Sequence, residues 1–137
     1  MSKEHKLQVQ MAVKFSQQRP EEKGLLWSTR NITLSVRDGQ KQKAMGMIKG
    51  VADLIYYKQD DFVAIEVKYP GEKHHKNQVE IQYNWGMKIT EQGGYYFIVT
   101  SLEGFWSIIE GFTEHKDVYS LKQIKDKLDN SGSTVIF

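Results

Sequence analysis

The chain has 137 residues, of which 39% are hydrophobic and 26% are charged, and its formal net charge is +2. This length fits one domain with a single hydrophobic core, and the composition is that of an ordinary folded protein. Cysteine is absent, which excludes disulfides, thiolate metal sites and cysteine nucleophiles. No apolar run approaches the ~18 residues of a membrane span, and the N-terminus lacks the apolar core of a secretory signal. We therefore expect a cytoplasmic protein that does not bind membranes and that can bind nucleic acid only through local clusters of basic residues.

The first segment, residues 4–18, fits two periodicities. Leu7, Met11 and Phe15 lie on one face of a helix, whereas every odd position from 7 to 15 is apolar, as in a strand. Both structures remain open from periodicity alone. Residues 25–36 follow, and they are predicted to be extended because they are rich in β-branched and aromatic side chains.

A turn is predicted at Asp38-Gly39, and a basic segment follows at residues 40–50. Residues 51–57 and 62–68 are predicted to be strands, because both are rich in β-branched and aromatic residues. The polar residues 58–61 separate them. The pair is therefore predicted to be an antiparallel hairpin.

Residues 77–92 again fit two periodicities. Ile81, Trp85 and Ile89 suit one face of a helix, but positions 79 to 89 also alternate as in a strand. The remaining predicted elements are a strand at 95–101, helices at 102–112 and 121–128, and a last strand at 134–137. This order predicts an α/β fold with a mixed sheet flanked by helices.

Three polar residues of the predicted hairpin can form a metal site. Glu66 and Lys68 are two residues apart and project from the same face of their strand, and Asp53 lies across the turn from them. Two carboxylates held close together repel each other unless a cation lies between them, and oxygen ligands suit Mg²⁺ or Mn²⁺. We expect the three side chains to meet in a pocket open to solvent, where such an ion activates water for attack on a phosphodiester.

The simpler alternative gives these residues no function. A Glu-x-Lys pair on the solvent face of an amphipathic strand is common, and Asp53 is equally compatible with an ordinary acid at a strand end. The pattern of residue types in the hairpin does not separate the two interpretations.

Four motifs stand in a fixed order along the chain. They are Glu4-His5-Lys6-Leu7-Gln8, Gly46-Met47-Ile48-Lys49-Gly50-Val51-Ala52-Asp53-Leu54, Glu66-Val67-Lys68, and a glutamine in the segment that ends at Gly94-Tyr95. This order resembles the VRR-type (virus-type replication-repair) nuclease domain of the PD-(D/E)xK superfamily, with Ala52 in place of the usual proline. The resemblance covers residues 4–112 of a single nuclease domain spanning 1–137, and it leaves 113–137 as a C-terminal extension of unassigned role.

The resemblance implies a restriction-endonuclease-like fold, in which both ambiguous segments are helices. It further implies a Mg²⁺- or Mn²⁺-dependent DNA endonuclease whose metal ligands are Asp53, Glu66 and the main-chain carbonyl of Val67. Glu4 would lie near the metal as an extra acid, although an ordinary solvated helix position is an equally good interpretation of it. Lys68 would orient or deprotonate the attacking water, or hold the phosphate.

The glutamine of the last motif has two matches. Gln82 would lie beside the scissile phosphate or Lys68, and Gln78 is the competing match because it lies ten residues after Lys68. The resemblance implies structured or branched DNA as substrate, including Holliday-like four-way junctions, and a homodimer with two active sites. The alternative function is a non-catalytic nucleic-acid-binding module with a nuclease-like fold.

The basic residues are predicted to contact the phosphate backbone of DNA. The predicted contacts are Lys43 and Lys49 in one strip, Lys73, His74, His75 and Lys76 in a basic loop at 72–76, and Gln78 beside it. His74 and His75 are not expected to share a metal ion, because adjacent residues on a regular element point apart. Ordinary solvated lysines are the alternative for these positions.

Overall fold

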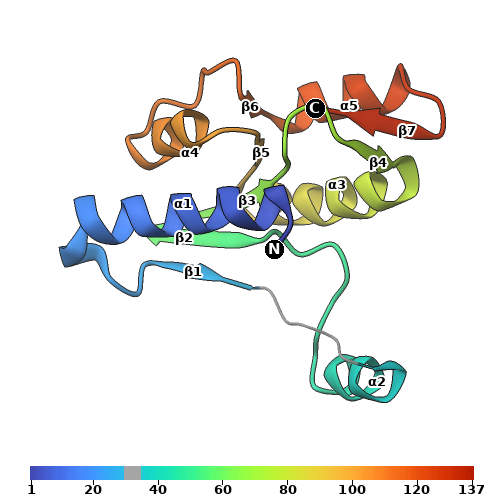
Figure 1. The fold of residues 1–137 in the computed structure, drawn as a ribbon, viewed down its shortest axis with the longest axis horizontal. Coiled ribbons are helices and arrows are strands. Elements are labelled where there is room, and N and C mark those ends of the chain that lie inside the picture. Colours follow the sequence, from blue (N-terminus) through green and yellow to red (C-terminus); the bar gives the residue numbers. More distant parts are fainter. Residues whose placement is uncertain (30–34) are drawn as a thin grey trace.

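The computed structural model describes residues 1–29 and 35–137, and it has a mixed five-stranded sheet at its centre (Figure 1). The strand order is β1-β2-β3-β5-β6, in which β3 and β5 are parallel and the other neighbours are antiparallel. The strands are β1 (Leu26–Ser28), β2 (Leu54–Lys58), β3 (Asp61–Val67), β5 (Tyr95–Val99) and β6 (Val118–Tyr119). The α/β class with a mixed sheet is confirmed.

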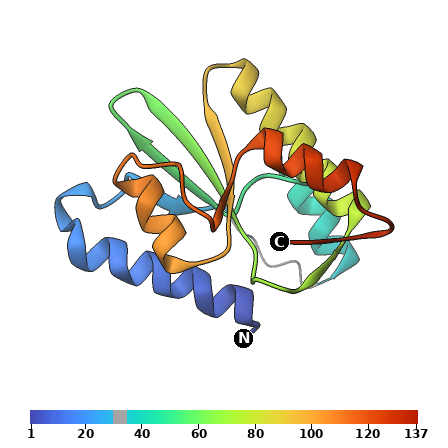
Figure 2. The same cartoon turned by 90° about the horizontal axis from the view of Figure 1, so that it is seen from above.

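Helices cover both faces of the sheet, as Figure 2 shows. Helices α1 (Lys3–Gln18) and α4 (Leu102–Ile109) pack on one face, while α3 (Lys76–Glu91) and α5 (Leu121–Asp129) pack on the other. A 3₁₀ turn, η1 (Pro20–Glu22), follows α1. Both ambiguous segments are therefore helices, and the helical spacing of 7, 11 and 15 marks the buried face of α1.

Alternation along β3 divides its side chains between the two helical layers. Ile65 and Val67 belong to the core under α1 and α4, whereas Ala64 belongs to the core under α3 and α5. Glu66 is two residues from Ala64 and therefore points to the α3 side of the sheet. The carboxylate is thus placed on a face that is covered by helices.

The predicted hairpin is confirmed. Strands β2 and β3 pair in antiparallel register with Leu54 opposite Ile65, and the turn consists of Gln59 and Asp60. Both turn residues have positive φ, 51° and 69°, which matches the right-handed twist of a tight two-residue hairpin. Between β3 and β5, α3 provides the crossover that a parallel pair requires.

The C-terminal extension completes the fold on the α3 side. Strand β7 (Thr134–Ile136) pairs antiparallel with β4 (Lys73–His75), and α5 buries Ile124 and Leu128 against the sheet. The prediction of a basic loop at 72–76 is therefore wrong at its centre, which is a strand. Its pairing partner lies some sixty residues further along the chain, so no local pattern indicates it.

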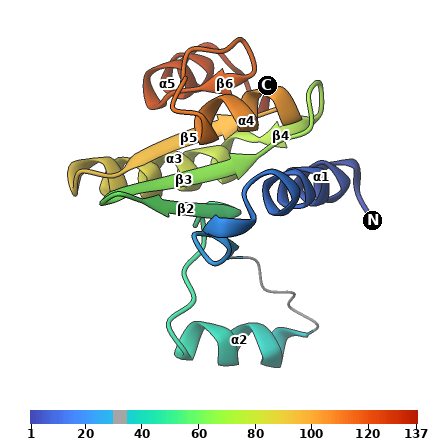
Figure 3. The same cartoon turned by 90° about the vertical axis from the view of Figure 1, so that its left-hand side faces the viewer.

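Helix α2 (Val36–Ala44) stands away from the sheet and its helices in Figures 1 and 3. It contradicts both the extended conformation predicted for Val36 and the turn predicted at Asp38-Gly39, since both positions lie within the helix. A glycine inside a helix costs only about 1 kcal/mol, so the turn signal did not decide the structure. Residues 30–34 of the predicted extended segment lie outside the described residues, and Leu26–Ser28 are extended as predicted.

None of the helices in the described ranges is long and apolar enough to cross a membrane.

Candidate metal centre

The hairpin register brings Asp53 opposite Glu66. Leu54 pairs with Ile65 at the end of the ladder, so extending this register by one residue places Asp53 level with Glu66. Asp53 lies one residue before β2, not within it as predicted. The main-chain N–H of Val67 donates to Oδ2 of Asp53 at 2.9 Å. The Asp53 carboxylate is thereby anchored at the C-terminal end of β3.

Lys68 follows directly after β3 and extends its pairing. Its main-chain N–H donates to the carbonyl of Val99 at 3.0 Å, and its Nζ lies 3.5 Å from Oε2 of Glu66. The prediction that Glu66 and Lys68 share a face is confirmed. Both side chains are buried, with exposed fractions of 3% for Glu66 and 1% for Lys68. A buried ammonium needs a partner of opposite charge, and Glu66 provides one.

Glu66 is in an environment that disfavours its negative charge. Burial, followed by the charge of Asp53, raises its pKa well above the usual value, and the charge of Lys68 acts in the opposite direction. Glu4 adds a smaller increase. A divalent cation would reverse this balance, because it favours the ionised form of every carboxylate around it.

Glu4 reaches the same place from the first turn of α1. A carboxylate oxygen of Glu4, one of Asp53 and one of Glu66 all lie within 4.8 Å of one another. Three oxygen donors at this spacing fit a hard divalent cation such as Mg²⁺ or Mn²⁺. Ligation by the carbonyl of Val67 stays a prediction.

Gln82, and not Gln78, is the glutamine beside the acids. From α3, Nε2 of Gln82 donates to Oε2 of Glu66 at 3.3 Å, whereas Gln78 lies one turn earlier and is exposed. Gln82 is 7% exposed, and its buried Oε1 has no hydrogen-bond partner among the described residues. Leaving a buried amide oxygen without a hydrogen-bond donor costs free energy. This oxygen can therefore accept a hydrogen bond from a bound donor such as a metal-bound water.

Tyr96 is a neighbour of the site that the sequence did not indicate. Tyr96 lies on β5 opposite Ala64 of β3. Burial, followed by the charges of Glu66 and Asp53, raises the pKa of its phenol well above the usual value. Its buried hydroxyl has no hydrogen-bond partner in the described part of the chain. A Cβ on Gly86 of α3 would lie 2.6 Å from Cγ of Tyr96, so close helix packing holds the ring. Only the β3–β5 pairing reveals this proximity.

The centre formed by Asp53, Glu66 and Lys68 is more enclosed than the sequence predicted. We expected all three side chains to face a pocket open to solvent. This is wrong for Glu66 and Lys68, which are buried, whereas Asp53 is half-buried at the edge of the site. Two surface hollows of about 500 Å³ each reach those edges and share Gly50. The first is lined by Asp53 together with Thr29, Gly46, Met47, Ile48, Gly50 and Val51. The second is lined by Gln82 together with Lys49, Gly50, His75, Asn77, Gln78 and Ile81.

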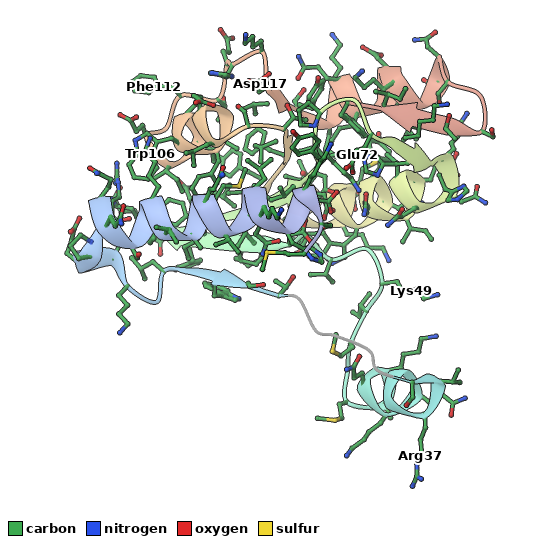
Figure 4. All side chains as sticks on the ribbon, in the orientation of Figure 1. Arg37, Lys49, Glu72, Trp106, Phe112 and Asp117 are labelled. Atoms are coloured by element: carbon green, nitrogen blue, oxygen red, sulfur yellow. The ribbon has the colours of Figure 1, made fainter. Side chains whose placement is uncertain are left out.

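The predicted DNA-contacting residues fall into two groups. Lys43, Lys49, Lys73, His75 and Gln78 are exposed, and Figure 4 shows Lys49 extending away from the ribbon between α2 and the sheet.

His74 and Lys76 are the exceptions in the predicted DNA-contacting set. Lys76 Nζ donates to the carbonyl of Ser131 at 3.3 Å. His74 points inward from β4, where burial, then the charge of Lys68, lowers its pKa. Its predicted place in a loop is wrong, because His74 lies in strand β4, where alternation sends it and its neighbours to opposite sides. A contact of His74 with DNA stays a prediction. The same alternation confirms that His74 and His75 point apart.

The chain matches no protein-family model, and it has no significant match among curated proteins or solved structures. The resemblance to the VRR-type nuclease domain therefore stays a prediction. The structural features that bear on function are the positions of Asp53, Glu66, Lys68, Glu4 and Gln82.

Proposed function

We propose that this protein is a Mg²⁺- or Mn²⁺-dependent DNA endonuclease that hydrolyses phosphodiester bonds. The observation that carries the proposal is that carboxylate oxygens of Asp53 and Glu66 lie within 4.8 Å of each other, next to a buried Lys68 whose Nζ lies 3.5 Å from Glu66. Burying the Glu66 carboxylate and the Lys68 ammonium beside a second, half-buried acid is costly for a purely structural purpose. A cation site in which the charges serve chemistry accounts for it.

Each side chain has a role that follows from its position. Asp53 and Glu66 hold the ion, and Glu4 adds a third carboxylate within reach. When bound, the ion lowers the pKa of a coordinated water and polarises the phosphate. Lys68 supplies positive charge where the phosphate gains negative charge. Gln82 holds the Glu66 carboxylate in orientation through its 3.3 Å hydrogen bond.

DNA is the proposed substrate because basic residues line one of the two hollows at the edges of the acidic site. Lys49 and His75 line the hollow beside Gln82, and Lys43 and Lys73 are exposed nearby in the chain. Such groups contact phosphates without reading sequence. Branched DNA of the four-way-junction kind, action as a homodimer and a cytoplasmic location belong to the same proposal, and they follow from the sequence resemblance and the composition.

The deciding experiment compares three proteins in a plasmid-nicking assay with Mn²⁺ or Mg²⁺. The wild type and the Glu91→Gln control, which changes an exposed carboxylate on α3, should nick the plasmid. Glu66→Gln should lose nearly all activity, and a chelator should abolish nicking by the wild type. Equal nicking by wild type and Glu66→Gln would overturn the proposal. Metal-independent DNA binding without hydrolysis would support the binding-module alternative instead.

A further inference from the structure

A second group of ligand-type side chains lies next to the first. Glu4 from α1, Glu72 from the turn before β4, and His74 from the middle of β4 each place one ligand atom within 4.8 Å of the others (Figure 4 labels Glu72). The three residues come from segments that only the tertiary structure brings together. Glu4 belongs to both groups, so the two sites are adjacent.

His74 is held as a ligand would be. Its β4 position pairs with Val135 of β7, and its ring lies 6.4 Å from that of Phe137, so the C-terminal strand fixes its orientation. Its Nε2 is shielded from solvent and has no hydrogen-bond partner among the described residues. A shielded ring nitrogen without a partner is costly, and a metal ion would satisfy it. His75 is exposed on the opposite side of the strand.

The ligand set indicates the class of ion. Two carboxylates and an imidazole suit first-row transition ions, whereas Mg²⁺ prefers oxygen ligands alone. Three protein ligands leave a position open for water. The ammonium of Lys68, which also acts on His74, opposes a cation here, but the two carboxylates carry more charge of the opposite sign.

We propose that Glu4, Glu72 and His74 bind a divalent transition-metal ion, Mn²⁺ or Zn²⁺, beside the Asp53–Glu66 site. This ion is additional to the one in the proposed nuclease mechanism. It does not require that mechanism to be correct, because Glu72 and His74 have no part in it.

The test uses Mn²⁺ alone as the probe and the full chain as the protein. Pulsed EPR of the Mn²⁺-loaded protein detects ¹⁴N coupling only when an imidazole ligates the ion, and titration of the EPR signal gives the stoichiometry. The wild type should bind two ions and show the coupling. His74→Gln should bind one ion fewer and lose the coupling, while the matched control His75→Gln should keep the metal stoichiometry and the ¹⁴N coupling of the wild type.

Other outcomes separate this proposal from the nuclease proposal. Absence of ¹⁴N coupling in the wild type, or coupling that persists in His74→Gln, would overturn the second site and leave the first untouched. If His74→Gln does not fold, Glu72→Gln must still lower the stoichiometry by one ion relative to the wild type for the proposal to stand. A nitrogen-ligated ion retained by Asp53→Asn would support the second site even if that variant shows that the first site binds nothing.

Discussion

Nζ of Lys68 lies 3.5 Å from Oε2 of Glu66, and both side chains are almost completely enclosed by protein. The pair is formed within one strand end, because residues two apart on an extended chain share a face. The charge of Lys68 therefore favours the ionised form of Glu66 in a place where water screens little.

Lys68→Met removes the ammonium but keeps an unbranched chain of similar length. Glu66 then lacks its counterion, so it takes up a proton more readily and binds a cation more weakly. We expect DNA cleavage to fall by about 100-fold or more. The exposed Lys88→Met on α3 is the control and should cleave at the wild-type rate. Cleavage by Lys68→Met at the wild-type rate would remove Lys68 from the mechanism.

The raised pKa of Glu66 makes metal-free stability depend on pH. Burial and the charge of Asp53 raise this pKa above 4.5, so folded Glu66 keeps a proton that the unfolded chain releases near that value. The free energy of unfolding should therefore fall as pH rises from about 4.5 through the raised pKa. Urea denaturation in a chelator measures this fall. Glu66→Gln should lack it, and Mg²⁺ should restore stability to the wild type at the alkaline end.

Gln82→Ala should weaken Mn²⁺ binding at the Asp53–Glu66 site by about 10- to 100-fold, because the amide that orients the Glu66 carboxylate is lost. Gln78→Ala removes the same side chain one turn earlier on α3, where it is exposed, and should leave the affinity unchanged. Isothermal titration with Mn²⁺ compares the two. Equal effects of both substitutions would show that the hydrogen bond to Glu66 has no bearing on metal binding.

Replacing Lys43 and Lys49 together with alanine should weaken DNA binding in a salt-dependent way. If each contacts one phosphate, the slope of log affinity against log salt should become shallower by about 2. Mn²⁺ binding should not change, because the group of side chains that can hold the ion consists of carboxylates and includes neither lysine. The control pair is Lys116 and Lys122, which are also exposed and lie outside the segment covered by the resemblance, residues 4–112. A slope identical to that of the wild type would exclude both predicted contacts.

Glu22 links η1 to the sheet and should matter for stability. It is 6% exposed and accepts hydrogen bonds from Tyr56, from Lys58 at 2.6 Å and from Arg19 at 3.2 Å. Burial raises its pKa, but these bonds outweigh burial and leave the pKa lowered. Glu22→Gln should cost about 1–3 kcal/mol of unfolding free energy, whereas the exposed neighbour Glu21→Gln should cost almost nothing.

The sign of the pH effect at Glu22 is opposite to that at Glu66. Because its pKa is lowered in the folded state, its stabilisation is present above about 4.5 and is lost as the pH falls through the folded value. Acid denaturation of the wild type should therefore be steeper than that of Glu22→Gln. Parallel acid transitions in the two proteins would contradict this account.

The sequence predicted correctly those helices and strands whose residue pattern is contained within the element itself. The hairpin was predicted because apolar runs flank a polar turn, and its observed bounds, Leu54–Lys58 and Asp61–Val67, differ from the prediction by a few residues. Strand β4 was wrongly predicted as a loop because its partner, β7, is distant in sequence. The turn at Asp38-Gly39 was wrong because a turn dipeptide is only a weak preference.

The sequence determined that Glu66 and Lys68 share a face, because they are two residues apart, and the predicted hairpin brought Asp53 to the same end of that face. Packing in three dimensions decided the rest: that Gln82 and not Gln78 contacts Glu66, that Tyr96 adjoins it, and that His74 points toward Glu4 and Glu72. The physical reason is range, because strand alternation acts between near neighbours, whereas the crossover through α3 and the pairing of β4 with β7 join residues that share no local pattern.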